Sequence, residues 1–169
     1  LYLDEVAERQ AERFEIGFTG GEPFVNPHMI RMLELTLERG FDALVLTNAM
    51  RPMLRHSVAA PLLQLKTQFG DRLTMRVSLD HYTSILHEKE RGIGSWKPAI
   101  DGMHWLSENG FNIHVAGRTC WGESVADARE GYDELFKRHG WCIDAANANE
   151  LVMFPEMELK TDLPEISTG

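Results

Sequence analysis

Apolar and polar residues follow one another along the chain with two different periods, and the pattern predicts five strands separated by helices. Short apolar runs, several with period two, are typical of strands. The predicted strands cover residues 15–19, 43–48, 73–80, 111–119 and 150–157. Elsewhere, apolar residues recur every three or four positions, as on one face of a helix. The predicted helices cover residues 1–14, 27–39, 52–69, 96–108 and 123–139.

Proline, glycine and capping residues set the predicted boundaries of these elements. Asn26 is a good N-cap, and Pro27 then takes the first helical position, where its missing N–H costs nothing. Pro61 should break the helical region 52–69. Residues 81–94 are polar and contain two glycines. They are predicted to form a long loop, which is a frequent location of functional residues.

The order of the predicted elements indicates a parallel α/β sheet with right-handed crossovers. From the pattern alone, such a sheet could close as a barrel or stay open as a doubly wound sheet. A chain of 169 residues has the size of a single domain. The chain does not begin with methionine, and residues 1–14 already show helical periodicity without an N-cap. We therefore expect a fragment or an excised domain.

Polar residues follow the carboxyl ends of the predicted strands, where parallel α/β folds bind their ligands. Glu22 and Asp80 can accept hydrogen bonds from an ammonium group. Ser78 and Arg118 could hold a carboxylate, which a guanidinium matches with two parallel hydrogen bonds. Glycines at positions 20 and 21 let the backbone approach a ligand closely. Ammonium and carboxylate together suggest an amino-acid moiety as the ligand.

Composition and charge exclude several other classes of protein. The formal charge of −9 without a Lys/Arg cluster argues against a nucleic-acid-binding surface. No apolar run approaches the ~20 residues that span a bilayer. Two cysteines, Cys120 and Cys142, cannot form a disulfide framework, so we expect a reducing, cytoplasmic setting.

The strand-end segments resemble those of radical S-adenosylmethionine (radical SAM) enzymes. The segment "FTGGEPF" resembles the GGE motif of that family, and "LTNA" looks like its TNG element with Ala49 in place of glycine. "VSLD" is similar to the fourth-strand motif, "HVAGRT" to the fifth-strand segment and "LVMFPE" to the sixth strand. The resemblance covers roughly residues 10–156.

This resemblance implies a partial (β/α)6 TIM-like barrel that lacks the first strand. Residues 1–14 would be the first crossover helix, 15–156 the strand–helix repeats and 157–169 the start of a C-terminal extension. It implies that S-adenosylmethionine (SAM) contacts Gly20, Gly21, Glu22, Pro23, Thr47, Asn48, Ser78, Asp80, Arg118, Val152 and Met153. Glu22 would take the amino group, Ser78 and Arg118 the carboxylate, and Asp80 the ribose or the substrate.

The chemistry implied for the intact protein is one-electron reduction of SAM to methionine and a 5′-deoxyadenosyl radical, which abstracts hydrogen from a substrate. The expected partners are a small-molecule or peptide substrate and an electron donor of the flavodoxin or ferredoxin type. Substrate identity in this family normally depends on regions outside the core. No catalytic residue and no metal ligand is predicted within this chain.

The chain departs from the family in lacking the CxxxCxxC motif, whose thiolates bind a [4Fe-4S] cluster. We expect a cluster only if such a segment lies upstream. Two alternatives stay open: a non-catalytic, degenerate barrel that binds SAM, and a divalent-metal TIM-barrel enzyme. The second would assemble histidines with Glu22 or Asp80. Its candidates are His81, His87, His104 and His114.

Overall fold

The computed structural model describes residues 14–119 and 122–155, which form one parallel sheet with helices between its strands. The sheet order is β1-β2-β3-β4-β5, and each neighbouring pair is parallel. The strands are β1 (Glu15–Phe18), β2 (Asp42–Thr47), β3 (Leu73–Ser78), β4 (Asn112–Thr119) and β5 (Leu151–Pro155). The predicted parallel alternation is therefore confirmed. The predicted helix 1–14 and extension 157–169 lie outside the described residues, apart from Phe14.

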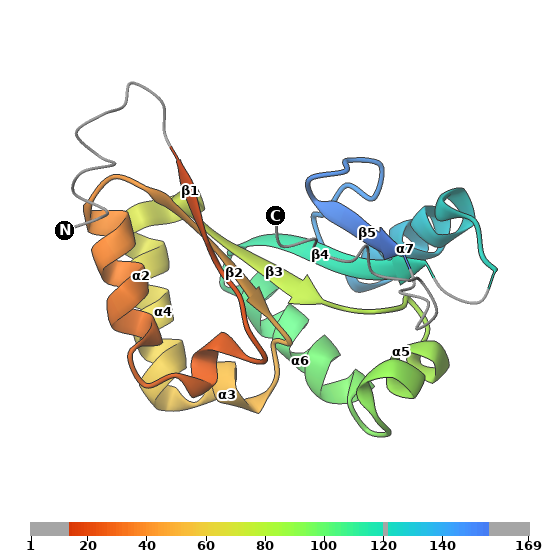
Figure 1. Cartoon of the computed structure of the whole chain (residues 1–169), viewed down its shortest axis with the longest axis horizontal. Coiled ribbons are helices and arrows are strands. Elements are labelled where there is room, and N and C mark those ends of the chain that lie inside the picture. Colours follow the sequence, from red (N-terminus) through yellow and green to blue (C-terminus); the bar gives the residue numbers. More distant parts are fainter. Residues whose placement is uncertain (1–13, 120–121, 156–169) are drawn as a thin grey trace, which may run out of the picture.

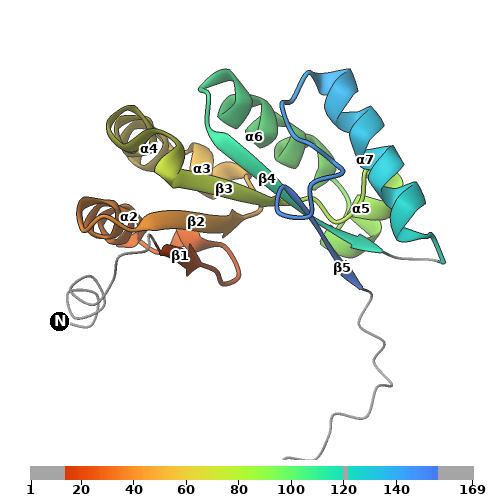
Figure 2. The ribbon, with the colours of Figure 1, turned by 90° about the horizontal axis from the view of Figure 1, so that it is seen from above.

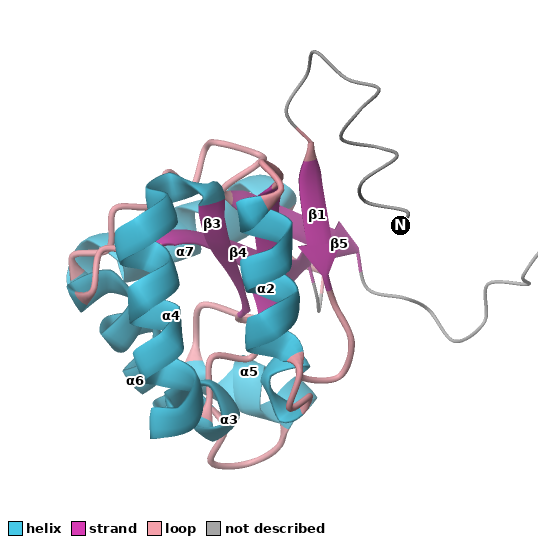
Figure 3. Ribbon diagram, turned by 90° about the vertical axis from the view of Figure 1, so that its left-hand side faces the viewer, coloured by secondary structure: helices cyan, strands magenta, loops and turns pink. Residues whose placement is uncertain are grey.

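The sheet curls into a half-barrel and carries its helices on the outer side (Figures 1 and 2). The helices are α2 (Met29–Glu38), α3 (Arg51–Leu54), α4 (His56–Phe69), α5 (Ser84–Arg91), α6 (Trp96–Glu108) and α7 (Val125–His139). Two 3-10 turns, η1 (Pro23–Val25) and η2 (Gly70–Arg72), precede α2 and β3. Figure 3 shows α2 and α4 packed side by side over the sheet. No described helix is long and apolar enough to cross a membrane.

One face of the sheet forms the hydrophobic core. Side chains alternate across a strand, and every second residue of β2 and β3 points to the helices. Ala43 and Val45 of β2 and Met75 and Val77 of β3 are fully buried in this core. The intervening side chains of both strands are mostly less buried and point to the concave face. The concave face is therefore where the fold can present polar groups to a ligand.

Two predicted helix boundaries were wrong. Asn26 does not cap α2: its side chain accepts a hydrogen bond from His28 N at 2.9 Å, and the helix begins two residues after Pro27. The break in the region 52–69 falls at Arg55, whose backbone is extended, whereas Pro61 lies inside α4. The Arg55 guanidinium donates to the carbonyls of Pro52 and Phe24, which favours the break at this position.

The loop predicted over residues 81–94 contains helix α5. Thr83 takes the N-cap position, and Gly92 ends the helix with φ of +95°. Between them lie good helix formers, Leu, Glu, Lys and Arg. The prediction failed because the usual amphipathic pattern is reversed here: the polar His87 is buried while Ile85 is 79% exposed.

The turn after β2 packs directly on helix α6. Ala49 is fully buried with φ of +57°, a left-handed conformation that is uncommon for alanine. Thr47 Oγ1 accepts a hydrogen bond from Ala49 N at 3.0 Å, and Asn48 Oδ1 accepts one from Met50 N at 2.9 Å. A Cβ atom added at Gly102 of α6 would lie 1.8 Å from the carbonyl oxygen of Ala49. Glycine at position 102 is what allows this close approach.

We predict that Gly102→Ala destabilises the domain by about 3 kcal/mol, because overpacking against a rigid backbone forces the helix or the turn to move. Urea unfolding followed by circular dichroism would measure the change. Gly17→Ala is the matched control, since nothing lies within 4 Å of a Cβ at that position. Its free energy of unfolding should stay within about 0.5 kcal/mol of the wild type. Equal effects of the two substitutions would contradict the packing argument.

Candidate functional site

The predicted site residues of the first four strands follow the carboxyl ends of those strands at one edge of the sheet. The turn Gly20–Pro23 follows β1, and Thr47 and Asn48 end β2. Ser78 and Asp80 end β3, and Arg118 lies near the end of β4. Because these four strands are parallel neighbours, the four groups share this edge. Within the edge, the structure divides them into two clusters.

The first cluster is built around the carboxylate of Glu22. Thr47 Oγ1 lies 2.9 and 3.0 Å from its two oxygens, and Asn48 N donates to Oε2 at 2.8 Å. Phe24 N donates to Oε1 at 3.2 Å, so Glu22 also caps η1. These bonds fasten the turn after β1 to the end of β2. A carboxylate offers about four acceptor positions, so Glu22 retains some capacity for a further donor.

The glycines beside Glu22 expose their backbone to solvent. Gly20 has φ of +149°, which residues with a side chain rarely adopt, and both Gly20 and Gly21 are exposed. No atom lies within 4 Å of a Cβ added at either position. Pro23, by contrast, is buried and begins η1, so it supports the turn from within. The turn can thus present carbonyl oxygens and a carboxylate to a cationic group.

The second cluster is built around Asp80, which is only 4% exposed. Arg91 Nε and Nη2 donate to its two carboxylate oxygens at 2.7 and 3.0 Å, which is a bidentate pair. Arg118 Nε lies 3.4 Å from Oδ1 and is the weaker partner. Burial acts to raise the pKa of Asp80, but the hydrogen bonds and charge of Arg91 and the charge of Arg118 outweigh it, so the pKa lies below its usual value.

A pocket of about 120 Å³ opens at this second cluster. It is lined by Leu46, Ser78, Asp80, Arg91, Ala116, Arg118 and Phe154. The pocket therefore brings together three of the predicted residues, Ser78, Asp80 and Arg118. One carboxylate faces two guanidinium groups, so these side chains carry a net charge of about +1. Such a pocket suits a ligand group that bears a negative charge.

The two β5 residues that were predicted to contact SAM lie on opposite faces of the sheet. Val152 pairs with Ala116 in the register and shares the face of Phe154, which lines the pocket. Met153 lies between them in sequence, on the opposite face, and packs against the hydrophobic core. Phe154, 47% exposed, lines the pocket and was not among the predicted residues.

Sequence reasoning also missed Arg91, the strongest partner of Asp80. It belongs to α5, the helix that was predicted as a loop, so no face could be assigned to it. One signal was available: a carboxylate at the end of a buried strand needs a cation or several hydrogen bonds. Among the basic residues that follow Asp80 in this segment, Lys89 and Arg91 were the candidates.

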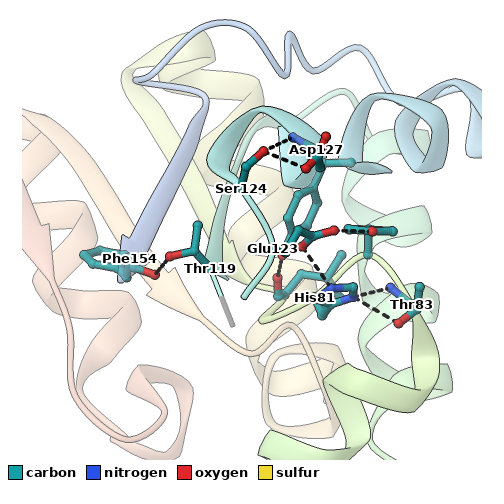
Figure 4. Close-up of polar contacts among 10 residues, drawn as sticks. His81, Thr83, Thr119, Glu123, Ser124, Asp127 and Phe154 are labelled. Atoms are coloured by element: carbon teal, nitrogen blue, oxygen red, sulfur yellow. Dashed lines mark hydrogen bonds and ion pairs between the residues drawn. The ribbon is translucent and has the colours of Figure 1, made fainter. Parts of the chain in front are cut away.

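A neighbouring cluster joins the loop after β3 to the start of α7 (Figure 4). His81 Nδ1 accepts a hydrogen bond from Thr83 N at 3.0 Å, so the ring proton lies on Nε2, 3.4 Å from Glu123 Oε2. Glu123 Oε1 accepts a hydrogen bond of 2.5 Å from the Tyr82 hydroxyl. This bond, with burial and the nearby carboxylates, raises the pKa of Tyr82 to about 12. Both nitrogens of His81 thus face protein partners.

The histidines do not converge on one point. His87 is fully buried, with no hydrogen-bond partner on either nitrogen, and packs against Trp96. His104 pairs with His139 on the outer helices, and His114 lies beside Arg76 on the concave face. Within residues 14–119 and 122–155, no three His, Cys, Asp or Glu side chains are placed to hold one metal ion. This arrangement does not support the divalent-metal alternative.

A [4Fe-4S] cluster does not fit this part of the chain either. Three thiolates are needed, and the described residues contain one cysteine, Cys142, which is exposed and far in sequence from the strand-end turn. Cys120 lies outside the described residues. No step of a mechanism is therefore assigned to cluster ligands in this chain.

Comparison with known proteins identifies one family and one set of similar folds. The sequence profile of a family described as "Radical SAM superfamily" matches residues 2–132, which is most of the chain. No curated protein matches the sequence.

Among solved structures, a crystal structure of Streptococcus suis SuiB has a TM-score of 0.65 at 15% identity, and the match covers 86% of this chain and 30% of SuiB. A crystal structure of Streptococcus suis SuiB bound to S-adenosylmethionine gives a TM-score of 0.65 at 15% identity and covers 88% of this chain and 31% of that one. At this identity the match shows a shared fold, and the partial TIM-like barrel is confirmed. The chain spans less than a third of the length of these structures.

We predict that Arg91→Met raises the pKa of Asp80, because burial remains while the strongest partner is lost. Because Asp80 has a lowered pKa in the folded protein, its contribution to stability is present above the unfolded value of about 3.9 and is lost as the pH falls through the folded value. At neutral pH the variant should therefore be less stable, by about 1–3 kcal/mol, because Asp80 is buried while Arg91 is partly exposed, and such a pair costs less to break than a fully buried one.

Carboxyl ¹³C NMR of Asp80 against pH, together with urea unfolding, would measure both effects. Arg138→Met is the control, since Arg138 is exposed on α7 and is not among the groups that shift the pKa of Asp80. An unchanged pKa of Asp80 in Arg91→Met would show that Arg118 alone accounts for the low value.

We predict that Glu123→Gln lowers the pKa of Tyr82 from about 12 toward its usual value of about 10, because the phenol loses its bond to a charged acceptor. NMR of ¹³C-labelled tyrosine against pH would report it. Glu130→Gln, on helix α7 that follows Glu123, is the control and should leave the pKa of Tyr82 unchanged, since Glu130 is not among the groups that shift it. If the two variants gave equal values, the Tyr82–Glu123 bond would not be the cause of the shift.

Proposed function

The chain belongs to the radical SAM superfamily, and on this basis we propose that its strand-end edge binds S-adenosylmethionine as part of a radical SAM enzyme. The observation that carries the proposal is that this edge has one region suited to a cation and a second region suited to an anion. The turn Gly20–Pro23 presents oxygen acceptors, while the pocket at Asp80 carries an excess of positive charge. An amino acid moiety, with its ammonium and its carboxylate, is complementary to both.

The acceptor side of the site is the turn after β1. We assign the amino group of SAM to the exposed carbonyls of Gly20 and Gly21 and to the remaining acceptor capacity of Glu22. Thr47 and Asn48 hold the carboxylate of Glu22 in place through three contacts of 2.8–3.0 Å. Their role is thus to orient Glu22, and Pro23 keeps the turn packed on the protein.

The donor side is the pocket at the ends of β3 and β4. The side chain of Arg118 is 40% exposed and makes only a long contact to Asp80. Its guanidinium can therefore donate hydrogen bonds to the carboxylate of SAM. Ser78 lines the same pocket and can add a hydroxyl donor. Asp80 already accepts from Arg91 through both oxygens. We therefore assign Asp80 first to holding Arg91 and, more weakly, Arg118, and we assign a ribose contact to its remaining lone pair.

The apolar part of the site comes from the end of β5 and its neighbour β4. Ala116 and Phe154 line the pocket, and Val152 pairs with Ala116. Phe154 is exposed enough to stack on a planar base such as adenine. Met153, on the core side, would support this strand and would not touch the base.

When bound and reduced by one electron, SAM supplies a radical that abstracts hydrogen from a substrate; the protein binds, orients and excludes water. The reduction needs a cluster whose ligands, in this proposal, lie outside the described residues. It also needs an electron donor of the flavodoxin or ferredoxin type. A small molecule or a peptide is the proposed substrate. The competing function is a SAM-binding module without catalysis, favoured by the absence of a cysteine triad among the described residues.

We predict that Glu22→Gln weakens SAM binding by the full-length protein about tenfold or more, because a hydrogen bond to a charged group contributes about 1.5–3 kcal/mol. Glutamine can accept from Asn48 N and Thr47 Oγ1 through its amide oxygen, but its amide nitrogen then faces Phe24 N, so circular dichroism has to show that the variant is folded. Calorimetric titration with SAM under anaerobic conditions measures the change. Glu108→Gln, exposed at the end of α6, is the matched control and should bind as the wild type does.

A separate assay for 5′-deoxyadenosine distinguishes the two functions. SAM binding with formation of 5′-deoxyadenosine, after cluster reconstitution and reduction, supports the radical enzyme. Binding without that product supports the degenerate module. Absence of SAM binding in the wild type would refute both.

A further inference from the structure

Arg76 lies on the concave face of β3, below the pocket at Asp80. It precedes Ser78 by two residues, so these two side chains point to the same side of the sheet, and Asp80 lines the same pocket as Ser78. In the register it lies between Leu46 of β2 and His114 of β4. Leu46 lines the pocket, so the row that contains Arg76 forms its inner border. Two residues along a strand correspond to roughly 7 Å.

The guanidinium of Arg76 has donors that the fold does not use. Its Nη2 donates to the carbonyl of Asn149 at 3.1 Å and contacts His114 Nδ1 at 3.4 Å. Its Nε is buried and has no hydrogen-bond partner. Buried donors are nearly always paired, and an unpaired charged donor is costly to stability. A ligand that supplies an acceptor is one way to satisfy such a group.

The charge of Arg76 is also not balanced by a carboxylate in the part of the chain that the structure describes. Glu150 is the acid that acts on neighbouring His114, and its two oxygens accept from Asp144 N at 2.8 Å and Asn147 Nδ2 at 2.9 Å. This acid therefore serves the loop before β5. Arg76 differs in this respect from Arg91 and Arg118, which share Asp80.

His114 completes the arrangement as a neutral partner. A guanidinium nitrogen can only donate, so the 3.4 Å contact makes Nδ1 of His114 the acceptor and leaves its proton on Nε2. Burial lowers the pKa of His114, and the charge of Arg76 lowers it further. At neutral pH the pair thus carries a single positive charge, on Arg76. The Nε2–H group of His114 and N–H groups of Arg76 can still donate to a ligand.

We propose that Arg76 and His114 form a subsite for a carboxylate group of the substrate, on the concave face below the strand-end pocket. This inference rests on the proposed function, since it places the substrate beside the site assigned to SAM. When the carboxylate of a substrate binds Arg76, the substrate atoms about 7 Å further along the strand direction lie at the level of Ser78, beside the pocket. The carboxylate belongs either to a small organic acid or to an acidic peptide, and the test separates these sources.

The test uses the full-length protein labelled with ¹⁵N in its histidines. The pKa of His114 is measured by NMR during titration with sodium acetate or with the peptide N-acetyl-Gly-Glu-Gly-amide, each against sodium chloride at equal ionic strength. An anion at Arg76 cancels the neighbouring positive charge, so the pKa of His114 should rise in a saturable way. A response to acetate alone supports a small-acid substrate, and a response to the peptide at lower concentration supports a peptide.

Three variants make the result specific. Arg76→Gln should abolish the saturable response, Arg76→Lys should weaken it while keeping the charge, and Arg138→Gln should leave it as in the wild type. No saturable response to either carboxylate in the wild type, or an equal response in Arg76→Gln, would overturn the proposal. Calorimetry with SAM separates the carboxylate subsite from the proposed SAM site. Arg76→Gln should bind SAM with unchanged affinity. Failure of the wild type to bind SAM would count against the proposed function alone.

Discussion

The buried carboxylate of Asp80 is the interaction on which the pocket depends. It lies at the end of β3, takes a bidentate pair from Arg91 of α5 and a longer contact from Arg118 of β4. A carboxylate this buried is unfavourable without cations, and here it has two. The excess positive charge then defines what the pocket can bind. One side chain thus connects a strand, a helix and a neighbouring strand to the chemistry of the site.

The half-barrel explains why this charge faces a ligand. Helices cover the outer face of the sheet, and the side chains that alternate with the core residues of β3, such as Arg76 and Ser78, point to the concave side (Figure 2). At the strand ends, Glu22 and the exposed glycines offer acceptors, while Arg118 offers donors. Deeper on the same face, Arg76 offers further donors. The concave face therefore carries two sites: one at the strand ends, suited to an amino-acid moiety, and a deeper one at Arg76, suited to a further anionic group.

The strands and their common edge could be predicted from the sequence, because period-two alternation and glycine turns are local signals. The structure brings Ser78, Asp80 and Arg118 together at one pocket, because parallel strands bring their ends to one edge. The long-range pairs could not be predicted. Arg91 belongs to a helix whose buried residue is a histidine and whose exposed one is an isoleucine, which hides its periodicity. Met153 and Phe154 differ only in strand phase, and that phase is fixed by the register with β4.

The central claim is that this edge recognises both charged groups of an amino-acid moiety. The most direct test is anaerobic calorimetry of the full-length protein with SAM and with decarboxylated SAM, which keeps the amine and the sulfonium but lacks the carboxylate. If Arg118 and Ser78 hold that carboxylate, the analogue should bind about tenfold more weakly or worse, as expected for the loss of a charge-assisted bond. Equal affinity for the two compounds would contradict the account.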